Sequence, residues 1–98
     1  MTEKKDGILD DIYKVIVERK KKPKEGSYVN YLLSGKYEKL YHKVEEEAKE
    51  VVDAAKRKAR NGVVWEATDL IFYLLVLMAA NGVKPEEIYQ EFARRRKG

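Results

Sequence analysis

The sequence predicts an all-α fold, a helical bundle built around a hairpin of two long helices. Apolar residues recur three and four positions apart along most of the chain, and no segment shows the apolar–polar alternation of a half-buried strand. Gly, Pro, Ser and Asn stand in short groups between these periodic segments, where they end helices. At 98 residues, the chain is expected to form one domain, residues 1–98.

The first part of the chain is expected to form one helix of medium length and one short helix. Apolar residues at helical spacing predict the first helix over residues 6–20. A segment with Pro and Gly, residues 22–26, interrupts it. Ser27 can then cap a short helix that runs to Leu33 and ends at Gly35.

The second part of the chain is expected to form three helices, and the two longest should pack as an antiparallel hairpin. The first should run over residues 36–60 and stop at the Asn-Gly pair 61–62. The next should run over residues 63–80 and stop at the Asn-Gly pair 81–82. Pro85 suits the first turn of a last helix that extends to about residue 95.

The composition narrows the class of protein. Charged residues make up 39% of the chain and the hydrophobic set 44%, which is typical of a soluble globular protein. The absence of cysteine excludes thiolate metal sites, and the single histidine, His42, excludes a multi-histidine zinc cage within one chain. The N-terminus has no apolar core of signal-peptide length, and the apolar run 70–80 is too short to span a bilayer. A cytoplasmic protein without a membrane partner is therefore expected.

The charge is unevenly distributed. Basic residues cluster in the segment 19–24 and in a tail, residues 94–98, that is expected to be flexible. Because these clusters carry more positive charge than the net +4, the rest of the chain is acidic. An acidic body with basic ends suits a cation-binding centre with phosphate contacts nearby better than it suits a nucleic-acid binder, which needs a continuous basic face.

An acidic stripe follows the long helix expected over residues 36–60. Glu46, Glu47 and Glu50 are three and four positions apart and share one arc of the helix, whereas Glu45 falls on the other flank. The simpler interpretation of this stripe is a solvated face on which the acids pair with neighbouring lysines such as Lys43.

Two acids on the following helix are more informative. Glu66 and Asp69 are the only charges between residues 63 and 80, and they lie one turn apart in a helix that is apolar on every side. Such a helix should be largely buried, and buried carboxylates must be protonated, paired with a cation or bound to a metal. A salt bridge to Lys43 or Lys56 is the alternative. Five acids from two adjacent helices favour an oxygen-ligand site for Mg²⁺ or Mn²⁺ instead.

Mg²⁺ held by carboxylates usually takes its other ligands from water and substrate phosphates, so a phosphorylated small molecule is the expected partner. No Walker A sequence is present, and two serines with one histidine make a serine-nucleophile triad implausible. The candidate phosphate contacts are basic residues along the chain, each of which could also be an ordinary solvated side chain. They are Arg19, Lys20, Lys39, Lys43 and Lys56.

These acids also carry a family resemblance. The runs Glu46-Glu47-Ala48-Lys49-Glu50 and Glu66-Ala67-Thr68-Asp69 match the EExxE and ExxD pair of the MazG-like, all-α nucleotide pyrophosphohydrolases. Within that superfamily, the segments Val17-Glu18-Arg19-Lys20 and Gly26-Ser27-Tyr28 make the chain resemble the phosphoribosyl-ATP pyrophosphohydrolases of histidine biosynthesis. The chain departs from the family pattern at Thr68, where Ala is usual, and at Phe72-Tyr73, where Tyr-His is usual. Tyr73 can still donate a hydrogen bond.

The resemblance implies Mg²⁺-dependent hydrolysis of the α–β phosphoanhydride of phosphoribosyl-ATP, giving phosphoribosyl-AMP and pyrophosphate. It also implies a MazG-like bundle completed by homodimerisation, and a stand-alone enzyme, because no cyclohydrolase segment precedes the domain. The implied metal ligands are Glu46, Glu47, Glu50, Glu66 and Asp69. Glu66 and Glu47 are the catalytic candidates, and the spacing does not decide which acid acts as the base.

Three other functions remain open at this point. The first is a related (d)NTP pyrophosphatase of the same superfamily. The second is a non-catalytic, nucleic-acid-binding helical dimer that uses the basic ends. The third is a scaffold bundle in which Glu66 and Asp69 only pair with lysines.

Overall fold

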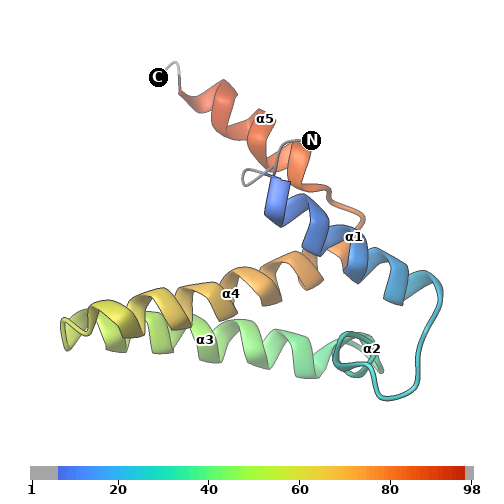
Figure 1. The fold of residues 1–98 in the computed structure, drawn as a ribbon, viewed down its shortest axis with the longest axis horizontal. Helices are drawn as coiled ribbons and strands as arrows, with labels where there is room; N and C mark the ends of the chain where they lie inside the picture. Colours follow the sequence, from blue (N-terminus) through green and yellow to red (C-terminus); the bar gives the residue numbers. More distant parts are fainter. Residues whose placement is uncertain (1–6, 97–98) are drawn as a thin grey trace.

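The computed structural model describes residues 7–96, which form five helices and no strand (Figure 1). The predicted all-α class is therefore confirmed. The helices are α1 (Ile8–Lys21), α2 (Tyr28–Leu33), α3 (Glu38–Lys56), α4 (Arg60–Ala80) and α5 (Pro85–Arg95).

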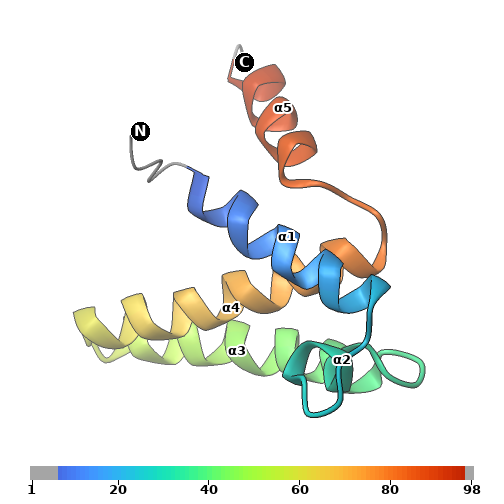
Figure 2. The same ribbon diagram turned by 45° about the vertical axis from the view of Figure 1, so that its right-hand side comes forward.

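The two longest helices form the expected hairpin. Helices α3 and α4 run antiparallel along each other for most of their length, and α2 packs near the N-terminal end of α3 (Figures 1 and 2). Helix α1 crosses the C-terminal part of α4, and α5 packs against α1 and points away from the hairpin. The hairpin therefore has one end embedded among the other helices and one end that projects from them.

The core lies at the embedded end of the hairpin. Ile16, Leu32, Leu40 and Val76 are its largest fully buried side chains, and each comes from a different helix, α1 to α4. Burying one such side chain stabilises the fold by about 1.5–3 kcal/mol, so this cluster holds the four helices together. The projecting half of the hairpin is held mainly by contacts between α3 and α4.

The hairpin turn differs from the prediction. Helix α3 ends at Lys56 and α4 begins at Arg60, so the Asn-Gly pair 61–62 lies inside the first turn of α4 and does not stop a helix. The chain reverses instead through Lys58, which adopts a left-handed conformation with a φ of 57°. Gly62 is required for a different reason: a Cβ there would lie 3.3 Å from Cβ of Ala59 and 3.4 Å from Cβ of Ala54.

Replacing Gly62 by valine should destabilise the protein by roughly 1–3 kcal/mol, because the added methyl groups would push the start of α4 away from α3. Urea denaturation followed by circular dichroism measures the change. Asn61→Val is the matched control, since Asn61 is exposed in the same helical turn. A Gly62→Val variant as stable as the Asn61→Val variant would show that the close approach at this turn is not tight.

The other helix ends largely follow the sequence signals. Ser27 caps α2 by accepting a hydrogen bond from the backbone N–H of Asn30, at 3.3 Å. Helix α4 ends at the Asn-Gly pair 81–82 as expected, with Gly82 at a φ of 70°, and Pro85 opens α5. Helix α3 begins two residues later than expected because Tyr37, which precedes it, is left-handed with a φ of 65°.

The chain termini were only partly predicted. The expected start of the first helix at Asp6 lies outside the described residues, and so do Lys97 and Gly98 of the basic tail. The tail was expected to be flexible from residue 94, and its first two residues, Arg94 and Arg95, lie in the last turn of α5. Both arginines form ion pairs with Glu91, because spacings of three and four residues place all three side chains on one helix face. Nε of Arg95 lies 2.8 Å from Oε2 of Glu91.

Helix α4 is much more exposed than its composition predicts. By length and composition it could cross a bilayer, which corrects the expectation that the apolar run 70–80 is too short, because the helix continues back to Arg60. Only 22% of its most apolar window is buried within this chain, and Trp65 is 65% and Ile71 42% exposed. The expectation of a largely buried helix is therefore not met in the isolated chain, because α3 covers one side of α4 and α1 and α2 add cover mainly near its C-terminal end.

Candidate metal centre

Three carboxylates from the two hairpin helices meet in one place. Glu47 of α3 and Glu66 and Asp69 of α4 each offer a carboxylate oxygen, and these three oxygens lie within 4.8 Å of one another. The three-residue spacing of Glu66 and Asp69 puts both on one face of α4, and the hairpin brings Glu47 against that face. We call this group the carboxylate cluster.

Glu47 is the cluster member with the most unusual environment. Its Oε1 atom is buried and has no hydrogen-bond partner. Burial, a hydrogen bond to Glu66 and the negative charges of Glu66, Asp69 and Glu46 raise the pKa of Glu47 to about 7. A buried acceptor atom without a hydrogen-bond partner lowers the free energy of unfolding, unless a proton or a cation lies beside it.

The salt-bridge alternative does not form around these acids. Lys43 pairs with Glu46 at 3.3 Å, and within the described residues neither Glu66 nor Asp69 forms an ion pair. The cluster is thus a concentration of carboxylate oxygen atoms that form no ion pair in the described part of the chain. Three hard oxygen donors, one of them orphaned, match what Mg²⁺ or Mn²⁺ requires of a protein.

The raised pKa of Glu47 predicts a pH dependence of stability in the metal-free protein. The folded state binds this proton more tightly than the unfolded chain does, so the resulting stabilisation is fully present below a pH of about 4.5 and is lost as the pH rises through about 7. In EDTA, the wild type should therefore lose stability relative to Glu47→Gln between these pH values. Denaturant titrations of both proteins measure the difference, and a difference that does not change with pH would contradict the environment described for Glu47.

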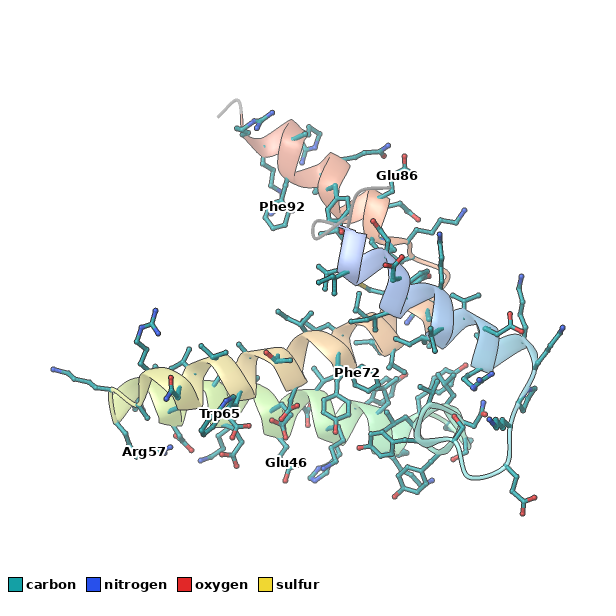
Figure 3. All side chains as sticks on the ribbon, viewed as in Figure 1. Glu46, Arg57, Trp65, Phe72, Glu86 and Phe92 are labelled. Atoms are coloured by element: carbon teal, nitrogen blue, oxygen red, sulfur yellow. The ribbon has the colours of Figure 1, made fainter. Side chains whose placement is uncertain are left out.

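The other two predicted ligands lie outside the cluster. Glu46 pairs with Lys43, as the simpler interpretation of the stripe allowed, and Glu50 is exposed and belongs to no group of three ligands in the described part of the chain. In Figure 3, Glu46 lies between Trp65 and Phe72 along the length of the hairpin. Both acids thus lie on α3 close in sequence to Glu47, but neither joins Glu47 in the group with Glu66 and Asp69.

The predicted phosphate contacts are spread over the molecule. Lys43 lies within electrostatic range of the cluster, because the charge of Glu47 acts on it. Hydrogen bonding to Glu46 and the charges of Glu46, Tyr28 and Glu47 raise the pKa of Lys43, although desolvation lowers it. Lys39 donates a hydrogen bond to Oγ of Ser34 at 3.2 Å, and Lys20 donates one to the carbonyl oxygen of Ala79 at 3.1 Å.

Two predicted phosphate contacts have no side-chain partner among the described residues. These are Arg19, whose backbone carbonyl accepts a hydrogen bond from Asn30, and Lys56 at the end of α3. The structure therefore does not bring the five basic residues together at one point.

A row of tyrosines continues from the cluster toward α2. Tyr73 is buried, at 9% exposure, and its hydroxyl lies 2.8 Å from that of Tyr28. Burial, this hydrogen bond and the charges of Tyr28, Glu47 and Asp69 raise the pKa of Tyr73. Hydrogen bonding by Tyr73 was expected from the sequence, whereas no role was expected for Tyr31, which stacks on Tyr28. The three-residue spacing of Tyr28 and Tyr31 in a short helix is the signal that could have indicated their contact.

Comparison with known proteins identifies the family of this sequence. Residues 9–96 match the family model described as Phosphoribosyl-ATP pyrophosphohydrolase. The chain is 44% identical to the phosphoribosyl-ATP pyrophosphatases of Geotalea daltonii and Sulfurisphaera tokodaii, in each case over 92% of its length, covering 85% and 96% of those proteins. It is also 51% identical over 86% of its length to the histidine biosynthesis bifunctional protein HisIE of Thermoanaerobacter pseudethanolicus, of which it spans only 39%.

Proposed function

The chain belongs to the phosphoribosyl-ATP pyrophosphohydrolase family, and on that basis we propose that it hydrolyses phosphoribosyl-ATP to phosphoribosyl-AMP and pyrophosphate. This reaction is the second step of histidine biosynthesis. The observation that carries the proposal beyond the family match is the carboxylate cluster, in which Glu47, Glu66 and Asp69 converge and form no ion pair within residues 7–96. A substrate with a chain of phosphates needs a divalent cation, and the cluster has the donor atoms to hold one.

Mg²⁺ is the proposed cofactor, with Mn²⁺ as a substitute. The orphaned Oε1 of Glu47 is an acceptor that such an ion would satisfy. Glu47, Glu66 and Asp69 would hold the ion directly. Glu46 and Glu50 remain proposed as further ligands, because both are exposed carboxylates next to the cluster in the sequence of α3. When bound, the ion supplies positive charge beside the phosphate oxygens and so stabilises the charge that develops there.

The protein's own part in the reaction is to position a water molecule and accept its proton. Hydrolysis joins the water oxygen to one phosphorus of the α–β anhydride and breaks the bond from that phosphorus to the bridging oxygen, which leaves with the bonding electrons, so that phosphoribosyl-AMP and pyrophosphate separate. A carboxylate next to the attacking water takes the proton. Glu66 and Glu47 are the proposed catalytic residues, because both belong to the carboxylate cluster and face each other across the hairpin.

Lys43 is the proposed phosphate contact nearest to the cluster, since it already pairs with Glu46 beside Glu47. A bound polyphosphate would compete for its ammonium group. Arg19, Lys20, Lys39 and Lys56 are proposed phosphate contacts at greater sequence distance from the acids.

A homodimer is the proposed assembly. Val64, Ile71 and Leu74 lie three and seven positions apart on α4 and all are substantially exposed in the single chain. Exposed apolar residues on one helix face are typical of a surface that another subunit covers. In such a dimer the apolar face of α4 would be buried in the shared bundle and not in a membrane.

The direct test is an assay for pyrophosphate release from phosphoribosyl-ATP, with Mg²⁺ and with EDTA, beside dCTP and dUTP as competing substrates. Mg²⁺-dependent release from phosphoribosyl-ATP alone supports the proposal. Preference for dCTP or dUTP would point to a housekeeping pyrophosphatase of the same superfamily. Failure to restore growth of a histidine-requiring host that lacks this step would count against the biosynthetic role.

A further inference from the structure

Tyr28 and Tyr31 form an exposed aromatic surface that leads away from the carboxylate cluster. Their rings stack with a centroid distance of 6.0 Å and an interplanar angle of 15°. Although both are large aromatic residues, Tyr28 is 44% and Tyr31 53% exposed, so neither is used mainly to fill the core. They also line an open hollow of about 670 Å³ beside the loop before α2.

The aromatic surface is fixed at both of its ends. Toward the cluster, the hydroxyl of Tyr28 is hydrogen-bonded to that of the buried Tyr73, a residue of α4 that follows Asp69 by one turn. At the other end, Nζ of Lys39 lies 5.1 Å from the centre of the Tyr31 ring and is held there by Oγ of Ser34. A cation over an aromatic face in this range is an attractive contact that holds the lysine in place.

The order along this surface is therefore carboxylates, tyrosine pair, cation. The proposed substrate has a matching order: a triphosphate at one end, a purine base in the middle and the phosphate of the phosphoribosyl group at the other end. Aromatic side chains bind bases by stacking, and a lysine binds phosphate as a point charge. An ordinary nucleoside triphosphate has no second phosphate for the distant lysine.

We propose that the Tyr28–Tyr31 pair binds the base of the nucleotide and that Lys39 binds the phosphate of the phosphoribosyl arm. This inference rests on the proposed function and adds the residues that select a nucleotide with a phosphate on each side of its base. In this arrangement Lys39 does not contact the triphosphate, which lies at the metal centre. Lys43 remains the proposed contact for those phosphates.

Calorimetric titration with phosphoribosyl-AMP and with AMP, both with Mg²⁺, separates the two contacts. Lys39→Met should weaken binding of phosphoribosyl-AMP about tenfold and leave binding of AMP within about twofold, because only the first ligand carries the second phosphate. Tyr31→Leu should weaken both ligands about tenfold, because it removes the stacking surface. Lys36→Met is the matched control, an exposed lysine three positions earlier in the sequence.

Kinetics provide an independent measurement of the same contact. Lys39→Met should raise KM for phosphoribosyl-ATP about tenfold with little change in kcat, and Lys39→Arg should restore most of the loss. Equal effects of Lys39→Met on the two ligands, or effects no larger than those of Lys36→Met, would overturn the inference while the activity of the wild type stands. A wild type that neither binds phosphoribosyl-AMP nor hydrolyses phosphoribosyl-ATP would overturn the proposed function as well.

Discussion

Asp69→Asn should lower kcat/KM for Mg²⁺-dependent hydrolysis of phosphoribosyl-ATP by roughly 10²- to 10⁴-fold. The amide keeps the size of the side chain but removes one of the three negative charges that converge between α3 and α4. A neutral oxygen is a much weaker ligand for a hard divalent cation. Steady-state rates over a range of Mg²⁺ concentrations measure the effect, and part of the loss should be recovered at high Mg²⁺ if metal affinity is what falls.

The same substitution should have the opposite effect on stability. Without metal, Asp69 repels Glu66 and Glu47, so Asp69→Asn should stabilise the metal-free protein by roughly 0.5–1 kcal/mol, a small value because Asp69 is exposed. A residue with only a structural role would lose activity and stability together. The opposite signs therefore separate a ligand from a structural residue.

Glu45→Gln is the control for Asp69→Asn. It removes an equal charge from α3, at an exposed position outside the cluster, and should change activity by less than about twofold. Full activity in Asp69→Asn, or an equal loss in Glu45→Gln, would remove the carboxylate cluster from the mechanism.

The features of the fold that depend on local pattern could be predicted from the sequence. Pro85 and the pair 81–82 mark helix ends because their backbone preferences act wherever they occur. The turn of the hairpin could not be predicted, because Lys58 carries no signal for its left-handed conformation. The pair 61–62 carries a signal for a stop, but Gly62 serves close packing against Ala54 instead.

The candidate site divides in the same way. The proximity of Glu66 and Asp69 follows from helical spacing alone, and the sequence predicted it. Which acid of α3 joins them depends on the register between two helices, and that register is set by a turn the sequence placed several residues too late. The contact of Tyr28 with Tyr73 spans 45 positions and could be found only in the folded chain.

Ile71→Glu should convert the proposed homodimer to monomers, weakening subunit association by at least about 100-fold. Ile71 is 42% exposed in the single chain although it lies in the middle of the most apolar helix, between Val64 and Leu74 on the same face. A carboxylate buried there against a second subunit would have no partner, whereas in a monomer it would be solvated at little cost. Analytical ultracentrifugation measures the dissociation constant, and Ile71→Val is the control because it keeps the face apolar.

The outcome also decides what covers α4. If the wild type is a dimer and Ile71→Glu is a folded, helical monomer, the exposed face of α4 is the subunit interface. A wild type that is monomeric across the micromolar range would contradict the dimer and leave an exposed apolar face without a partner. Activity of the Ile71→Glu monomer then carries separate information. The carboxylate cluster lies within one chain, so a monomer that still binds Mg²⁺ but turns over slowly would show that the partner completes the substrate site and not the metal site.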